Sequence, residues 1–538
     1  MKYSLIRSIK LTAALGAAAM VATAAASAQT MPLDKYLVKS DDCVGCGPVE
    51  LNNMTEVQAY MGQVNAHMSA RPSRGFNGPS YGGFHRRSPW RNVQVVFLDF
   101  DAGGASTFPV CRSDNTLFGI FNDHVYTPAE RAEITERIAH DYGQFNFHVT
   151  SERPSSGDFT TIFMGQNDAP EDCSQGSNIT VFPSGGVSIL FGRAEGIDFL
   201  NKNKSDNAFA EASFWEFLAQ LDPSGGLLEA FSGVSIAEFG SVEAAKNFAV
   251  VNQSANTGAH EAGHIQGLRH QNSFGAPGDG LPDTGAISPF EFVPVFPGSS
   301  DASETVLHTM ASGASVGLSL NGSAAVDRFF SERSAARLAI NQFGRVISEA
   351  RVRGHRARRL RDRVLLTYVR VPNTIEEGQN ENARIKVNAA VVNGEISAVD
   401  EVDSYTFRGR RGEFFNAELI SVIGRDLSFA EGIMGQLRLY KVNRDGSETF
   451  VASNLQSFES LFDAEMFDIV LPENGLYRVE VTAPDEFFPA DTNGDGELDA
   501  FPLEANGGVG LLQGKYSLQM YTCVKRLRRA RSHRMASN

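Results

Sequence analysis

Three histidines and one glutamate lie close together in this 538-residue chain, at a spacing suited to metal chemistry. His260 and His264 are four residues apart, so on a helix they share a face and can reach one ion. Gly267 accepts a positive φ, which lets the helix end and the chain turn back to bring His270 in as a third ligand. The sequence therefore predicts that three imidazoles bind one metal ion, with zinc as the expected element.

Glu261 directly follows the first histidine and is predicted to act on water rather than on the metal. Three imidazoles leave a fourth position on zinc open, which is typical of catalytic sites. Zinc lowers the pKa of a bound water to about 7, and Glu261 would take its proton during attack on a carbonyl and pass it to the leaving amine. The alternatives are a helix with surface histidines or a bound but inert zinc ion.

The run from His260 to His270 resembles the motif H-E-x-x-H-x-x-G-x-x-H of the metzincin clan of zinc peptidases. The stretch 307–313 resembles the clan's Met-turn, in which a methionine packs beneath the three histidines, and Met310 matches that methionine. The resemblance implies a zinc-dependent endopeptidase acting on a protein or peptide. Ser312 stands where astacin- and serralysin-like members carry a tyrosine, so no subfamily is assigned. His308 is interpreted as an exposed loop residue rather than a fourth ligand.

Strands and helices are expected around this motif. Residues 93–100 form an apolar run typical of a buried strand. Thr127, Pro128 and Glu130 predict a helix start, with a cap, a first-turn proline and a capping-box glutamate. Further strands are expected at 145–150, 159–164 and 187–191, a helical insertion at 196–245, and a terminal helix at 331–341. The strand at 187–191 is predicted to be the sheet edge with which an extended substrate pairs.

After residue 383, short runs alternate apolar and polar residues and are separated by turns such as Asn393-Gly394, which predicts a β-sandwich. Through segments 394–396, 403–407, 475–477 and 514–516, this part resembles the bacterial pre-peptidase C-terminal domain, which implies an accessory role. The expected fold is therefore an α+β metzincin-like catalytic domain followed by an all-β sandwich. The first would have a mixed twisted sheet, two long helices, the active-site helix and a small lower subdomain.

A second metal site is suggested by a run of alternating oxygen ligands with glycine at its sixth position, as in calcium loops. The ligands would be Asp491, Asn493, Asp495, Glu497 and Asp499. Pro502 occupies the twelfth position, where an EF-hand has glutamate, and nearby prolines argue against flanking helices. The alternatives are a stand-alone Ca²⁺ loop and an acidic hairpin without metal.

The first 28 residues have the basic start, apolar run and Ala-x-Ala end of a secretory signal peptide, which predicts export by a bacterium to the periplasm or medium. Their removal takes away three basic residues and changes the net charge from −15 to −18, which disfavours nucleic acid as a partner. No later run is apolar enough to suggest a membrane span. The sequence does not specify the oligomeric state.

Five cysteines leave one unpaired if disulfides form after export. A bridge between Cys111 and Cys173 is predicted because both fall in the catalytic portion. Cys43 and Cys46 are interpreted as a local disulfide or a zinc-free loop, with a latency cysteine as the alternative.

The expected divisions are a signal peptide (1–28), a propeptide or linker (29–90), the catalytic domain (91–345), an Arg-rich linker (346–382), the sandwich (383–522) and a basic tail (523–538). The rival function is a secreted binding or adhesion protein with a non-catalytic zinc site. Another rival is a zinc hydrolase of a different amide, such as a cell-wall peptide.

Overall fold

The chain forms two compact units in the computed structural model. The structure describes residues 93–101, 107–165, 173, 179–183, 187–189, 191–194, 197–201, 203–273, 308–310, 324–325, 327–349, 363–372, 384–398, 400–421, 433, 435–454, 463–483, 486–490, 499–502 and 513–526. The predicted signal peptide, the segment 29–90 with Cys43 and Cys46, and most of the predicted lower subdomain lie outside these ranges. None of the described helices has both the length and the apolar character needed to cross a bilayer.

The first unit contains a five-stranded mixed sheet with the order β4-β1-β5-β9-β8. Its strands are β4 (Phe147–Thr150), β1 (Gln94–Asp99), β5 (Thr160–Met164), β9 (Asn207–Ala210) and β8 (Gly192–Ala194). The first four are parallel to one another, and β8 runs antiparallel to β9. The apolar run of β1 is almost fully buried, which confirms the predicted interior strand.

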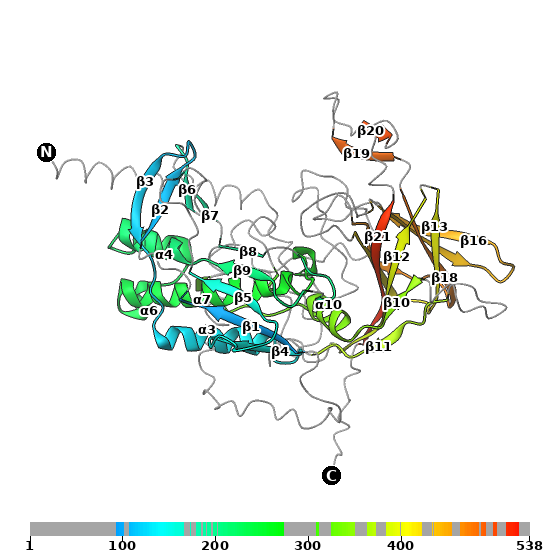
Figure 1. The fold of residues 1–538 in the computed structure, drawn as a ribbon, viewed down its shortest axis with the longest axis horizontal. Helices are drawn as coiled ribbons and strands as arrows, with labels where there is room; N and C mark the ends of the chain where they lie inside the picture. Colours follow the sequence, from blue (N-terminus) through cyan, green and yellow to red (C-terminus); the bar gives the residue numbers. More distant parts are fainter. Residues whose placement is uncertain are drawn as a thin grey trace, which may run out of the picture. The chain divides into compact units, whose positions relative to one another are not determined.

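Two long helices belong to this unit. α3 (Pro128–Asp141) begins with the capping box that the sequence predicted, because Thr127 and Glu130 each bind the other's backbone N–H. α7 (Val242–His264) starts at Ser241, whose side chain accepts a hydrogen bond from the Ala244 N–H. Figure 1 shows α3 and α7 running beside the sheet, and α7 contacts α3, β5, β8 and β9.

The stretch 196–245, predicted to be a helical insertion, has helices only from Ser213 onward. It contains α4 (Ser213–Leu221), α5 (Gly226–Ser232) and α6 (Ile236–Phe239), but also β9, which is an interior strand of the sheet. The prediction missed β9 because its four residues are too few to show a clear period.

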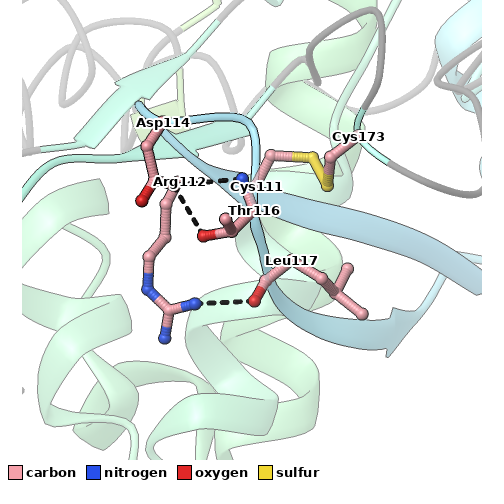
Figure 2. Close-up of a disulfide and its surroundings, with 6 residues drawn as sticks. All are labelled: Cys111, Arg112, Asp114, Thr116, Leu117 and Cys173. Atoms are coloured by element: carbon pink, nitrogen blue, oxygen red, sulfur yellow. Dashed lines mark hydrogen bonds between the residues drawn. A yellow bond between two sulfur atoms is a disulfide. The ribbon is translucent and has the colours of Figure 1, made fainter.

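A second sheet of the first unit has the order β3-β2-β6-β7. It comprises β2 (Thr107–Arg112), β3 (Leu117–Asn122), β6 (Ile179–Val181) and β7 (Val187–Ile189). Cys111 forms a disulfide with Cys173, as predicted, and Figure 2 shows it beside the turn that joins β2 to β3. In that turn the Arg112 side chain donates a hydrogen bond of 2.7 Å to the Leu117 carbonyl. The strand expected at 187–191 is present as β7, but it forms the edge of this second sheet and not of the five-stranded sheet.

The second unit is a β-sandwich-like pair of sheets. One sheet has the order β10-β12-β21-β14-β17 with β11 paired to β12, and the other has the order β13-β18-β15-β16. Both contribute to one apolar core, in which the rings of Phe407 and Phe415 stack with centroids 4.7 Å apart. The strands are β10 (Val346–Ser348), β11 (Thr367–Val369), β12 (Arg384–Ile396), β13 (Val402–Gly409), β14 (Phe414–Ser421), β15 (Gln436–Val442), β16 (Glu448–Asn454), β17 (Glu465–Val470), β18 (Gly475–Thr482) and β21 (Gly514–Arg526).

This unit differs from the predictions at one turn and at its edges. The turn predicted at Asn393-Gly394 is wrong, because both residues lie within β12 and pair with β21. Strands β10 and β11 fall within the expected linker 346–382, because both pair with β12. Strand β21 continues through Cys523 to Arg526, so the strand overlaps the expected tail. Helix α10 (Glu332–Phe343), expected to end the catalytic unit, groups with the sandwich.

Candidate metal centre and catalytic residues

The three predicted ligands converge. His260 and His264 lie one turn apart at the C-terminal end of α7, and His270 begins the short 3-10 helix η2 (His270–Ser273). Their Nε2 atoms are 3.0 Å apart for His260 and His264, and that of His270 lies 3.2 Å from each. Within the described ranges, this is the one group of three or more His, Cys, Asp or Glu side chains close enough to share an ion.

The turn that brings in the third histidine depends on Gly267, which has a φ of +83°. The Leu268 N–H donates to the Gly263 carbonyl and the Gly267 N–H to the His264 carbonyl, each at 2.9 Å. These are the two hydrogen bonds of a Schellman motif, with glycine in its usual left-handed position. The glycine therefore has the conformation that the sequence predicted.

The hydrogen bonds of the rings decide which nitrogens face the centre. His260 Nδ1 lies 2.7 Å from the Thr309 carbonyl, and His264 Nδ1 lies 3.0 Å from the Leu268 carbonyl. Because a carbonyl oxygen only accepts, both Nδ1 atoms carry the proton and both Nε2 atoms present lone pairs. Two lone pairs at 3.0 Å repel each other unless a cation lies between them. Zinc–nitrogen bonds at tetrahedral angles place ligand nitrogens about 3.3 Å apart, so the donor set fits zinc.

The charge state of His260 agrees with this assignment. Its burial, followed by the two neighbouring imidazoles, lowers the pKa of His260 well below its usual value. The ring is therefore neutral at neutral pH, which is the form that binds a metal.

Met310 lies beneath the metal-binding end of α7. The side chain is fully buried, and a Cβ added to Gly263 would be 2.5 Å from its Sδ atom. Thr309, the preceding residue, is the one whose carbonyl holds His260. This stretch therefore supports both the ring orientation and the helix that carries it.

His308 is not the exposed loop residue that the sequence suggested. It is buried, and its Nδ1 hydrogen-bonds the Ser273 carbonyl. Its backbone forms a β-bridge with Phe329. Burial lowers the pKa of His308 to about 4. It is absent from the group of converging ligands among the described residues.

Glu261 is buried beside the ligands but does not join them. Burial raises the pKa of its carboxyl to about 8, while His270 and a hydrogen bond from the backbone of Ala194 oppose the rise. Ala194 is the last residue of β8, so the carboxylate lies beside one of the two edge strands of the five-stranded sheet. A carboxyl group in this position can accept and release protons close to the metal centre.

The contributions of Thr309, Leu268 and Ala194 come from backbone atoms, and the sequence analysis missed them. No residue type or spacing marks such contacts in advance. The five predicted calcium ligands cannot be placed in the same way, because residues 491–498 and the side chain of Asp499 lie outside the described part. Strands β19 (Glu486–Ala490) and β20 (Asp499–Pro502) flank that segment and pair with each other, which agrees with the absence of flanking helices.

Comparison with known proteins leaves the family open. No protein-family model matches the chain, and no curated protein matches it. Among solved structures, the pre-peptidase C-terminal domain of a Bacillus anthracis collagenase is 12% identical, with a TM-score of 0.14, and the match covers 24% of this chain and 85% of that one. A periplasmic inhibitor of g-type lysozyme from Aeromonas hydrophila is 11% identical, with a TM-score of 0.14, and covers 33% of this chain and 98% of that one. At these scores, neither likeness carries an argument about function.

Proposed function

We propose that this chain is an exported, metzincin-like zinc endopeptidase in which His260, His264 and His270 hold the ion and Glu261 is the general base. The observation that carries the proposal is the convergence of three Nε2 atoms beside the buried carboxyl of Glu261, which lies on α7 with two of the three histidines. The disulfide between Cys111 and Cys173 supports export, because such bonds persist in oxidising compartments.

The chemistry divides between the ion and the protein. Zinc in this site would supply a Lewis acid that polarises a substrate carbonyl and makes water a stronger nucleophile near neutral pH. Glu261 accepts the proton of the attacking water and delivers it to the departing amine nitrogen. The backbone carbonyls of Thr309 and Leu268 fix the rings, so that the ligands need not reorganise.

A peptide substrate is supported by the position of β8. One side of this strand pairs with β9, and no described strand pairs with the other side. An extended peptide that adds to this edge would run past Glu261, which hydrogen-bonds the backbone of β8. We assign the second unit an accessory role, because the four site residues all belong to the first unit.

The test compares the wild-type chain with Glu261→Gln on a denatured protein and on a cell-wall peptide, with zinc measured in each preparation. We expect the wild type to cleave the protein and the variant to lose about 10²–10⁴-fold in kcat, because a positioned acid/base contributes that much. The variant should keep one zinc per chain, since this carboxyl is not among the converging ligands.

Glu238→Gln is the matched control, because Glu238 is an exposed glutamate in α6 and the same change there should leave kcat unaltered. Equal activity of wild type and Glu261→Gln would refute the peptidase mechanism and favour a binding protein. If only the cell-wall peptide is cleaved, the chain would instead be a zinc hydrolase of that other amide.

A further inference from the structure

Strand β8 meets the proposed general base at Gly192. We infer that Gly192 is a positioning residue for Glu261: the missing side chain lets β8 lie directly against the carboxylate and define its place. The inference rests on the proposed function, since it concerns the same base.

Glycine is required at position 192 because there is no room for a Cβ, and not because of the backbone conformation. A Cβ at this position would lie 2.4 Å from Glu261 Oε1, 2.9 Å from Glu261 Cγ and 2.5 Å from Thr257 Cγ2. Real Cβ contacts are essentially never shorter than 3.0 Å, so something must shift. Gly192 is not among the described glycines with positive φ, so its backbone suits other residues. Side-chain volume is therefore the property that a substitution here would change.

The obstructing atoms belong to side chains, whereas the strand itself is held. β8 pairs with β9 in the register Gly192↔Ala210, Arg193↔Phe209 and Ala194↔Ala208. A further backbone hydrogen bond runs from Glu211 N–H to the carbonyl of Phe191, just before the strand. Thr257 is fixed by a hydrogen bond of 2.7 Å from Gln253 Nε2 to its hydroxyl. The carboxylate end of Glu261 is therefore the group most free to move when a methyl is added.

Two features of β8 act on Glu261 together. Gly192 sets how closely the strand approaches, and the Ala194 backbone donates the hydrogen bond that orients the carboxylate. The strand proposed to receive the substrate would thus also place the base beside it. A displacement of about 1 Å in a reacting group can reduce the rate about 10²-fold.

The experiment uses the full chain with Gly192→Ala. We expect kcat to fall about 10²-fold while KM stays within about threefold, because placement of the base and not substrate binding is disturbed. Zinc content should remain one per chain, and the variant should stay folded at the assay temperature even if the added methyl lowers its thermal midpoint. Gly119→Ala is the control, since Gly119 lies in β3 and its added Cβ would meet only the Phe121 ring, at 3.0 Å. The control should keep the wild-type kcat.

A second variant separates the two neighbours of Gly192. The double variant combines Gly192→Ala with Thr257→Ser. The change at Thr257 removes its Cγ2 methyl but keeps the hydroxyl that binds Gln253. We expect the double variant to remain slow, because the contact with Glu261 persists. Recovery of the wild-type kcat would assign the effect to Thr257 and overturn the inference.

Crystal structures of wild type and Gly192→Ala supply a readout that does not need activity. The inference expects a displaced Glu261 carboxylate with the β8–β9 register intact. It is overturned if the carboxylate stays in place, or if β8 separates from β9 instead. Absence of peptidase activity in the wild type would remove the proposed function, and the position of the carboxylate in the two crystals would still decide whether Gly192 places it.

Discussion

At the scale of single residues, Glu211 is a buried carboxyl group that lies close to a second acidic side chain. It directly follows β9, is 1% exposed, and its Oε1 accepts a hydrogen bond of 2.5 Å from the Ser213 N–H. Its Oε2 has no hydrogen-bond partner among the described residues. The Ser213 hydroxyl donates to Asp123, a carboxylate on the other side of the serine. Burial, and then the charge of Asp123, raise the pKa of Glu211 to about 7.

This raised pKa predicts a pH-dependent stability. Above its ordinary pKa of 4.5, Glu211 ionises in the unfolded chain, whereas the folded chain keeps the proton until about pH 7. The free energy of unfolding should therefore fall as pH rises through this window, by an amount on the order of 3 kcal/mol. Glu211→Gln keeps an acceptor for Ser213 and cannot ionise, so it should lose less stability between about pH 4.5 and pH 7.5.

Urea unfolding of both chains across this pH range measures the difference. Identical pH dependence in the two chains would show that Glu211 is ionised in the folded state. Glu238→Gln, in an exposed position, should match the wild type throughout.

At the scale of elements, α7 and the segment at Met310 depend on each other. Gly263 lies in α7 next to His264, and its missing side chain leaves room for the Met310 sulfur and for Leu268 Cδ1. A Cβ added to Gly263 would lie 3.2 Å from Leu268 Cδ1. Alanine in a helix is normally favoured over glycine by about 1 kcal/mol. Here we expect Gly263→Ala to destabilise the chain, because the added methyl would lie 2.5 Å from Met310 Sδ.

A double-mutant cycle tests this dependence. Met310→Ala alone should reduce the free energy of unfolding by about 2–5 kcal/mol, since it empties a fully buried position. Combined with Gly263→Ala, the loss should be smaller than the sum of the single losses by about 0.5–3 kcal/mol. The free energies of unfolding should be measured on metal-free protein, so that differences in zinc affinity do not alter them. Strict additivity would mean that the two residues do not compete for space.

The elements also show what the sequence could and could not predict. The start of α3 and the turn at Gly267 follow from neighbouring residues, so local patterns were sufficient. The convergence of the three histidines was predictable for the same reason, because His260 and His264 lie one helical turn apart and His270 follows the turn at Gly267. Strand β8 and the role of Gly192 depend on pairing with a distant strand and on space beside α7. Such contacts between distant segments leave no periodic signal in three residues.

At the scale of the whole molecule, α10 shows where one unit ends and the next begins. Arg333 and Asp468 are both fully buried, with Nη2 and Oδ2 2.7 Å apart, and Arg337 Nη1 lies 2.5 Å from Glu418. The Arg333 guanidinium also lies 5.0 Å from the ring of Phe467. Both carboxylates come from strands of the sandwich, which explains why this helix groups with the second unit. Helical periodicity located α10 but contained no information about its partner.

Removal of one charge from the Arg333–Asp468 pair should therefore destabilise the second unit. Arg333→Met leaves the buried Asp468 without its guanidinium, which we expect to cost about 3–5 kcal/mol. Neither of the chain's two tryptophans, Trp90 and Trp215, is a residue of the second unit, so tryptophan fluorescence does not report on that unit directly. Calorimetry should show a lowered transition that fluorescence does not detect, with zinc content unchanged. Replacing Asp468 by asparagine as well should recover part of the loss, because the buried carboxylate without a partner is then gone and asparagine tolerates the φ of +53° at this position. If the fluorescence transition falls in parallel, α10 would instead contribute to the stability of the first unit.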